Sequence, residues 1–320
     1  MELFLPTLNQ MAFLLLLIVI GYILTRLRVV PDNAPGVLSK MENNVFIPAL
    51  VMGTFMSNFT IASFGTAGKF LLVGFVVIGI TAPLAVLLAR LCNKDSYIRK
   101  IYTYGLAFSN FGFMGNAVVE ALFPEIFMEY LIFVLPFWML IYVWGVPALL
   151  IPAEGERRTI AQRLKSFLNP MFIAMLVGMV LGLLKPWLPL PGFFSSAVST
   201  LGGCMSPVAM ILTGMTIAKI DLKATFKNWN IYLVSIIRLV AIPAVAIVVL
   251  MVIMKLLPME RGLAVCILCS LAMPLGLNTI VVPAGYGQDT TVASGMALIS
   301  HLLSCISIPL IFMLFQVAVG

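Results

Sequence analysis

Charged residues are scarce in this chain: Asp, Glu, Lys and Arg make up 10% of its 320 residues. Soluble globular domains carry about 25% charged residues. By contrast, 62% of this chain is hydrophobic, and its mean hydropathy is +1.12. Apolar runs of nearly span length recur from one end of the sequence to the other, which is typical of a polytopic membrane protein. The sequence therefore predicts an all-α membrane protein without a sizeable soluble domain.

The chain also lacks the residues that several enzyme classes and metal sites need. It has a single histidine, His301, which excludes a zinc motif of the HExxH kind. Its aspartates fall at the ends of apolar runs, which argues against an intramembrane aspartyl protease. No nucleotide-binding loop of the GxxxxGKS type is present. We expect no enzyme activity, no metal and no cofactor.

Five cysteines are an odd number and form no recognisable disulfide framework. The CxxC formed by Cys266 and Cys269 lies in an apolar run, where we interpret it as packing rather than as a redox pair. Glu2, and no basic residue, precedes the first apolar run, and no small-residue cleavage site follows it. We therefore expect a retained helix rather than a signal peptide.

Hydropathy places ten membrane spans along the chain, joined by short connections. Their expected ranges are 6–26, 35–57, 67–91, 99–123, 127–152, 168–184, 193–218, 229–254, 260–283 and 290–317. The longest polar segment divides them into two groups of five. We expect a first repeat over residues 1–153, a cytoplasmic linker over 154–166 and a second repeat over 167–320.

Lysine and arginine set the predicted orientation. With the N-terminus outside, the loops after spans 1, 3, 5 and 7 are cytoplasmic and hold thirteen basic residues, namely Arg26, Arg28, Arg90, Lys94, Arg99, Lys100, Arg157, Arg158, Arg163, Lys165, Lys219, Lys223 and Lys227. The external side holds four, which are Lys69, Lys185, Lys255 and Arg261. The positive-inside rule therefore predicts that both termini are extracytoplasmic. This distribution also accounts for most of the net charge of +7, so we expect no nucleic-acid partner beside the lipid bilayer.

Landmark residues recur in the two halves at a nearly constant offset of 159 to 162 residues. The matched pairs are Gly21 with Gly182, Pro48 with Pro207, Pro83 with Pro243, Asn116 with Asn278 and Pro147 with Pro309. A repeat of five spans crosses the membrane an odd number of times, so the second copy has to be inverted. The sequence predicts the inverted-repeat architecture of many secondary transporters.

Two stretches are built to interrupt spans 4 and 9 at corresponding places. Ser109–Asn116 contains two glycines and two asparagines, and Met273–Asn278 contains proline, glycine and asparagine. Broken helices crossing near the midplane present free N–H groups to a ligand, and asparagines add donors and acceptors. The predicted substrate-binding residues are Asn110, Gly112, Gly115, Asn116, Pro274, Gly276 and Asn278. The alternative is close helix packing with interhelical hydrogen bonds.

Arg238 lies nine residues into span 8, about 14 Å along the helix and too deep for easy snorkelling. A charge at that depth costs about 2.5–3.5 kcal/mol on insertion scales, so it should face a cavity or a partner. Two interpretations stay open. Arg238 attracts an anionic substrate or forms a charge pair that breaks during transport, or it forms a static ion pair that ties span 8 to its neighbours.

Three further residues are candidates for charge or ion coupling. Glu42 lies about two turns inside span 2 and offers a protonatable carboxylate. Glu120 lies late in span 4, near the outer boundary, where solvation is the simpler explanation. His301 lies in the first half of span 10 and belongs to the residue type that titrates near neutral pH, although a lone histidine is more often a packing residue. Asp289 is expected to be the N-cap of span 10.

With these residues in view, the sequence resembles the auxin efflux carrier family, in a bacterial branch that includes proteins regarded as malonate transporters. The resemblance covers the whole chain and is carried by Asn110 with Gly112-Phe113-Met114-Gly115, by Arg238-Leu239 followed by Pro243, and by Pro274, Asn278, Tyr286, Asp289 and Ser304 through Pro309. It implies a location in a bacterial-type inner or plasma membrane.

The resemblance also implies a fold. Spans 4 and 9 cross in a mobile transport domain of spans 3–5 and 8–10, while spans 1, 2, 6 and 7 form a scaffold that often dimerises. The fold is similar to those of bile-acid sodium symporters and proton antiporters, and the family moves organic anions by an elevator-like motion. Two departures stand out. Ala117 replaces a usual proline, so span 4 is either bent or fully broken, and His301 stands where threonine is common.

The sequence therefore predicts a secondary transporter of a small organic anion, either a malonate-like dicarboxylate, a monocarboxylate or an indole acid. It works by alternating access and is driven by a proton, a sodium ion or the membrane potential. A passive anion channel and a ligand-binding membrane receptor are the alternatives.

Overall fold

The structure is a computed structural model that describes residues 4–151, 170–187, 190–219, 227–256, 259–285 and 288–319. Within these residues the ordered elements are helices, and the one β-type contact is an isolated antiparallel bridge between Ser109 and Leu275. The all-α class predicted from hydropathy is confirmed. The expected linker 154–166 and Tyr286 lie outside the described residues.

The helices of the first half are α1 (Phe4–Arg26), α2 (Ala34–Met41), η1 (Glu42–Phe46), α3 (Ile47–Asn58), α4 (Ser63–Cys92), α5 (Ser96–Ala107), η2 (Phe111–Gly115), α6 (Asn116–Leu122), η3 (Pro124–Ile126), α7 (Phe127–Phe133), α8 (Leu135–Leu140) and η4 (Ile141–Leu150). Those of the second half are α10 (Pro170–Leu184), α11 (Gly192–Gly203), α12 (Met205–Ile217), α14 (Trp229–Ile236), η5 (Ile237–Ala241), α15 (Ile242–Leu256), α16 (Arg261–Ala272), α17 (Asn278–Gly285) and α18 (Thr291–Val319).

These helices occupy the ten expected ranges, with ends that differ by a few residues. Six stretches of the described chain are long and apolar enough to count as candidate membrane spans by themselves, namely Phe4–Arg26, Gly65–Cys92, Pro124–Leu150, Gly192–Ile217, Trp229–Leu256 and Thr291–Ala318. The other expected spans have physical reasons to fall short. The helices in ranges 99–123 and 260–283 are interrupted, and the segment from α2 to α3 carries Lys40 and Glu42 in its first half. In range 168–184 the described helix, α10, has 15 residues.

Glycines bring two helix pairs into close contact. Gly178 and Gly182 of α10 are four residues apart, and a Cβ on either would lie 2.6–2.7 Å from a backbone carbonyl of α3. Gly21 of α1 and Gly214 of α12 likewise face backbone carbonyls of the partner helix. Small residues at four-residue spacing let helix backbones approach in membranes, where dispersion contacts drive association. These glycines explain why α3 packs extensively against α10, and α1 against α12.

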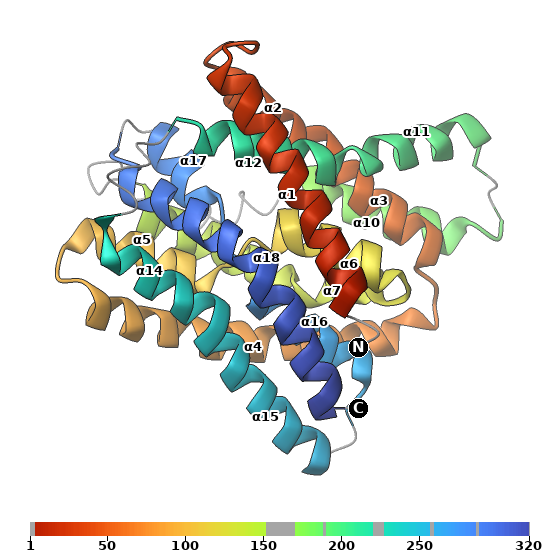
Figure 1. Cartoon of the computed structure of the whole chain (residues 1–320). Coiled ribbons are helices and arrows are strands. Elements are labelled where there is room, and N and C mark those ends of the chain that lie inside the picture. The colour runs from red at the N-terminus through yellow and green to blue at the C-terminus, as the bar shows by residue number, and fades with distance from the viewer. Residues whose placement is uncertain are drawn as a thin grey trace.

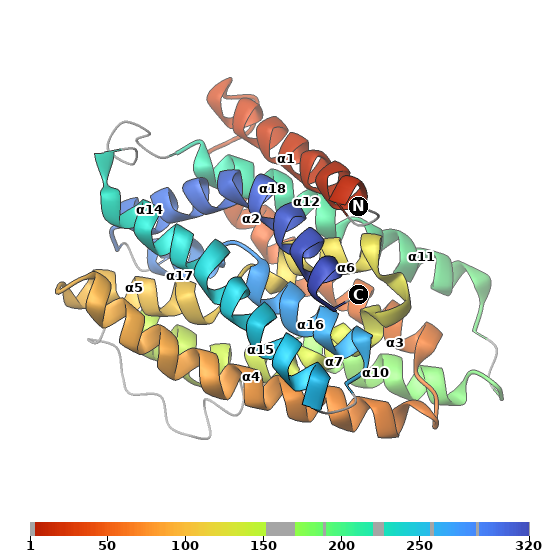
Figure 2. The same cartoon turned by 60° about the horizontal axis from the view of Figure 1, so that its bottom comes forward.

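The interior of the bundle is formed by the two interrupted segments. In Figure 2, α1 lies on one face of the molecule and α4 on the opposite face, with α16 and α6 between them. Every residue from Leu263 to Ala272 of α16 is buried, as is every residue from Ile101 to Ala107 of α5. A helix that is apolar and buried all round is a core helix. The start of α1 and the end of α18 lie at the same end of the bundle (Figure 1).

Several of the candidate residues lie in short π-helical segments. Glu42 begins η1, Gly112 and Gly115 lie in η2, and Arg238 lies in η5. A π-helical turn widens the hydrogen-bonding ring, and such turns are frequent at functional sites. The segments therefore mark places where the helices depart from regular packing.

Candidate functional site

The first interruption separates α5 from η2 and consists of Phe108, Ser109 and Asn110. Phe108 is extended (φ −117°, ψ 104°), and Asn110 leaves the helical region (φ −77°, ψ 43°). The interruption overlaps the predicted stretch Ser109–Asn116 at Ser109 and Asn110, whereas Gly112 and Gly115 lie in η2 after it. The chain is broken rather than bent despite the missing proline, since the extended residues precede the glycines.

The two glycines of η2 instead serve close packing. A Cβ on Gly112 would lie 2.5 Å from the ring of Trp138, and a Cβ on Gly115 would meet the hydroxyl of Tyr130. That hydroxyl donates to the carbonyl of Phe111 at 3.1 Å. Gly112 and Gly115 therefore let η2 lie directly against α7 and α8.

The second interruption lies between α16 and α17 and spans Met273 to Leu277. Met273 is extended (φ −70°, ψ 153°), the conformation imposed on a residue that precedes proline, here Pro274. A Cβ on Gly276 would lie 3.0 Å from the carbonyl oxygen of Phe108. The missing side chain of Gly276 thus allows the two interruptions to touch.

The two interruptions satisfy each other's polar groups. The N–H of Asn110 donates to the carbonyl of Pro274 at 2.7 Å, and the hydroxyl of Ser109 donates to the carbonyl of Ser270 at 2.6 Å. Unpaired backbone groups at membrane depth are tolerated only where protein or a cavity surrounds them. The pairing explains how both helices can be broken in the same buried place.

Arg238 connects the C-terminal ends of α5 and α16, the helices that precede the two interruptions. Its Nη1 donates to the carbonyl of Leu106 in α5 at 2.8 Å, its Nη2 to Ser270 of α16 at 3.0 Å, and its Nε to Met273 at 3.2 Å. Helix C-termini carry partial negative charge and unpaired carbonyls, so a cation is favoured there. Among the described residues no carboxylate pairs with this fully buried side chain, whose hydrogen-bond partners are backbone carbonyls.

The three predicted asparagines have different surroundings and do not bond to one another among the described residues. Asn110 bonds through Nδ2 to the Nε2 of His301 at 3.1 Å. The Nδ2 of Asn278 donates to the hydroxyl of Tyr104 at 3.0 Å. Asn116 is buried, and its Oδ1 has no hydrogen-bond partner in the described structure. Among the three asparagines, Asn116 is therefore the one with a fully buried side-chain atom that lacks a hydrogen-bond partner in the described structure.

Asn116 lines a small cavity where the interrupted segment meets α3 and α10. The cavity has a volume of about 10 Å³, the size of one water molecule. Its walls are formed by Val51, Phe55, Asn116, Leu131, Leu135, Trp138, Met171 and Met175. The remaining lining is thus apolar, so Asn116 supplies the hydrogen-bonding groups of this site.

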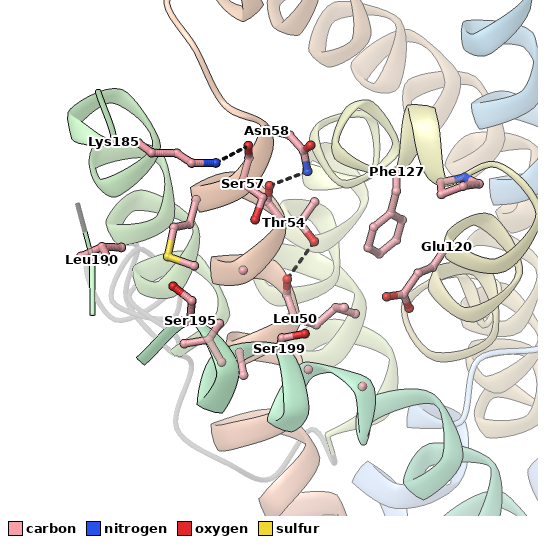
Figure 3. Close-up of a pocket in the computed structure, with 17 residues that line it drawn as sticks. Leu50, Thr54, Ser57, Asn58, Glu120, Phe127, Lys185, Leu190, Ser195 and Ser199 are labelled. Atoms are coloured by element: carbon pink, nitrogen blue, oxygen red, sulfur yellow. Dashed lines mark hydrogen bonds between the residues drawn. The ribbon is translucent and has the colours of Figure 1, made fainter. Parts of the chain in front are cut away.

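A larger cavity of about 880 Å³ lies between α3 and α11 on one side and α6 and α7 on the other. Figure 3 shows Thr54, Ser199 and Lys185 on the first side, facing Glu120 and Phe127 across the space. The volume is within the range of small-molecule sites. Glu120 is exposed in this cavity, as expected for a solvated carboxylate. It is not part of the crossing, by which we mean the contact between the interruptions 108–110 and 273–277.

Glu42 lies apart from the crossing, in η1 among α2, α3, α10, α11 and α12. It is fully buried, and neither carboxylate oxygen has a hydrogen-bond partner in the described structure. Asp289 is the cap of α18, because its Oδ1 accepts from the N–H of Thr291 at 2.9 Å. Hydrogen bonds from Thr291 lower the pKa of Asp289 below its ordinary value.

The structure adds residues that were not predicted as site residues. Ser109 and Ser270 connect the two interruptions, and Tyr104 holds Asn278. The hydroxyl of Ser300 accepts from the N–H of Leu275 at 3.3 Å. In the sequence these residues share only a side-chain hydroxyl, of serine or tyrosine, within an apolar run. Such residues are common in packed helices, so the residue type alone does not identify a site.

Comparison with known proteins is consistent with this architecture. No curated protein matches the chain. A family model described as Membrane transport protein matches twice, over residues 6–163 and 156–312, so the two halves of the chain each resemble the same family. The family is one of transporters rather than enzymes, and the helices make this a multi-pass membrane protein. The chain belongs to the Membrane transport protein family, which is the family of the auxin efflux carriers.

Proposed function

We propose that this protein is a secondary transporter of a small organic anion, which binds where the two interrupted helices cross. The observation that carries the proposal is the electrostatics of the crossing. Arg238 occupies the C-terminal ends of α5 and α16, while the helices that begin at Phe111 and Asn278 direct their N-termini toward the same region. A buried cation with two helix N-termini, and with no carboxylate bonded to it in the described part of the chain, favours an anion.

The buried Oδ1 of Asn116 gives independent support for a ligand at this place. An unpaired polar atom in an apolar setting costs about 1–3 kcal/mol, so it is retained where it has a use. We place one polar group of the substrate at Asn116, with Asn110 and Asn278 nearby on the crossing segments. Gly112, Gly115, Pro274 and Gly276 shape the backbone around it.

The transport mechanism that we propose is alternating access by an elevator-type motion. The ten helical ranges form ten spans in two inverted repeats, with both termini extracytoplasmic and the protein in a bacterial-type plasma membrane. In this orientation the cavity of about 880 Å³ opens outward, between a scaffold of spans 1, 2, 6 and 7 and a transport group that contains α6. Dimerisation through the scaffold stays a prediction.

Counterflow in proteoliposomes tests the function. Labelled acetate, malonate and indole acetate are each offered to vesicles preloaded with the same unlabelled anion. A transporter shows saturable uptake that the internal anion accelerates. Linear uptake without acceleration indicates a passive channel, and absence of uptake with ligand-dependent thermal stabilisation indicates a receptor.

Asparagine variants test the site. We expect Asn110→Ala and Asn278→Ala to abolish uptake while leaving expression intact. Asn43→Ala is the matched control, because Asn43 is exposed and bonds only within its own helix, to Ser39. Unchanged uptake in both crossing variants would move the substrate to another place in the molecule.

A further inference from the structure

The only histidine of the chain is bonded on both sides within the crossing. His301 lies ten residues into α18 and is 1% exposed. Its Nδ1 lies 2.8 Å from the carbonyl of Ala297, and its Nε2 lies 3.1 Å from the Nδ2 of Asn110. A carbonyl can only accept, so Nδ1 carries the ring hydrogen, and Nε2 accepts from the amide of Asn110. The neutral ring therefore fixes which way the Asn110 amide points.

We propose that His301 couples proton uptake to anion binding by reversing the amide of Asn110. The proposal rests on the function proposed above and names how that site is coupled. A protonated imidazole donates from both nitrogens, so Nε2–H can no longer accept from Asn110. Rotation of the amide about its terminal bond brings Oδ1 to Nε2–H and turns the NH₂ group to the opposite side. One proton from water is added to the ring, and no covalent bond to carbon or oxygen changes.

This reversal changes what the crossing offers to a carboxylate. In the neutral state the side of Asn110 away from His301 presents a carbonyl oxygen, which repels a carboxylate oxygen. In the protonated state that side presents N–H donors, and the ring adds a positive charge. The protonated state therefore binds the anion more tightly. By linkage, a bound anion raises the affinity of the ring for the proton by the same factor.

The charges around His301 support this mutual dependence of ring protonation and anion binding. The elements packed on α18 are α1, α12, α14, α15, α17 and η5. Their charged or titratable groups are Tyr22, Arg26, Tyr232, Arg238 and Lys255, and α18 itself adds Cys305, which contacts the backbone carbonyl of His301. Tyr104 of α5 and Cys266 and Cys269 of α16 lie in the helices that precede the two interruptions. Arg238 is the fully buried cation among them, and it opposes a second charge nearby unless an anion enters.

The state of the ring can be read directly, because His301 is the one histidine in the sequence. The test uses full-length protein labelled with nitrogen-15 histidine and purified through a histidine-free tag, with acetate, malonate or indole acetate as the probe. We expect a neutral ring protonated at Nδ1 without anion and a doubly protonated ring with saturating anion. A ring that stays neutral with a bound anion overturns the proposal.

Proton uptake gives a second reading. In weakly buffered solution, addition of a binding anion should remove about one proton per anion bound, and affinity should fall about tenfold per pH unit once the free ring is neutral. His301→Thr should bind the anion without proton uptake and with little dependence on pH, since a hydroxyl can accept or donate. Cys305→Ser, one turn away on the same helix, is the matched control and should behave as the wild type.

The outcomes separate the two proposals. If the wild-type protein binds none of the three anions, the proposed function fails and the coupling falls with it. If it binds one of them with no proton uptake, or if His301→Thr keeps the pH dependence of the wild type, the coupling alone is wrong. Should His301→Thr not fold, the ring signal of the wild-type protein still decides.

Discussion

Ser109 and Ser270 lie 161 residues apart in sequence and are joined by a hydrogen bond of 2.6 Å from the hydroxyl of one to the carbonyl of the other. This separation equals the offset between matched landmarks of the two halves. If the halves are the predicted repeats, positions that correspond in the two halves meet in this contact. The same carbonyl of Ser270 also accepts from Arg238 at 3.0 Å, so the contact is part of a network that extends to span 8.

Arg238→Met should destabilise the fold. The substitution removes the donor to the carbonyls of Leu106 and Met273, whereas the carbonyl of Ser270 keeps the hydroxyl of Ser109. Each unsatisfied buried group costs about 1–3 kcal/mol, offset in part because a buried charge is removed. We expect the free energy of unfolding in a fixed detergent to fall by about 2 kcal/mol or more. Arg90→Gln, at an exposed position late in α4, should unfold like the wild type. Equal stability of Arg238→Met and wild type would show that the guanidinium does not hold the helix ends.

Gly276→Ala should separate the two interruptions. The added Cβ would lie 3.0 Å from the carbonyl of Phe108 and 3.3 Å from that of Ser109, and both contacts are with backbone. Overpacking of this kind costs about 1–3 kcal/mol. Thermal unfolding measures the loss, and Gly79→Ala is the control because a Cβ at that position would meet no neighbouring atom within 4 Å. A Gly276→Ala protein as stable and active as Gly79→Ala contradicts the close contact.

Asn116→Asp should reduce anion uptake by at least about tenfold, because a carboxylate in the small cavity repels a carboxylate substrate at short range. Asn116→Ala should also lose uptake, through the missing hydrogen bond. Initial rates of counterflow at several anion concentrations measure both effects. Asn43→Asp, on the exposed side of η1, controls for added negative charge. Retained uptake in Asn116→Asp would rule out a carboxylate bound at this residue.

Glu42→Gln should stabilise the fold and preserve anion uptake. Both oxygens of Glu42 are buried without partners, and burial of an unpaired charge is costlier than burial of an amide of similar shape. The residue also lies outside the crossing, so the substitution leaves the proposed site intact. Melting temperature and counterflow measure the two effects, with exposed Glu125→Gln as the control. Loss of uptake in a folded Glu42→Gln protein would instead assign Glu42 to ion coupling.

Much of the fold could be predicted from the sequence, because membrane spans are set by hydropathy and the bilayer fixes their length. The helix ranges and the existence of two interruptions followed from apolar runs and from residues such as Pro274. The position of the first interruption followed only in part, because it covers Phe108 to Asn110 at the start of the predicted stretch and not the glycines. Glycine marks both unwound backbone and close packing, and in η2 it is the contact with Trp138 and Tyr130 that requires Gly112 and Gly115.

The site was predicted less completely than the fold. Arg238 was recognised as a buried charge in need of a partner, but its partners are backbone carbonyls, and backbone atoms leave no trace in a pattern of residue types. His301 was recognised as a candidate, whereas its bond to Asn110 depends on how α18 packs on the crossing. Contacts between distant segments are set by tertiary packing, which a single sequence does not display.

The attachment of one guanidinium to both α5 and α16 limits how the protein can move. If these helices slid past each other, Arg238 could keep its hydrogen bonds to only one of them, and the contacts between the interruptions would be lost as well. The two half-helices therefore have to travel as a unit. In the proposed transport cycle, slippage would fall instead on the apolar seam where Leu131, Leu135 and Trp138 meet Met171 and Met175, and flexible methionines suit a surface that repacks as it moves.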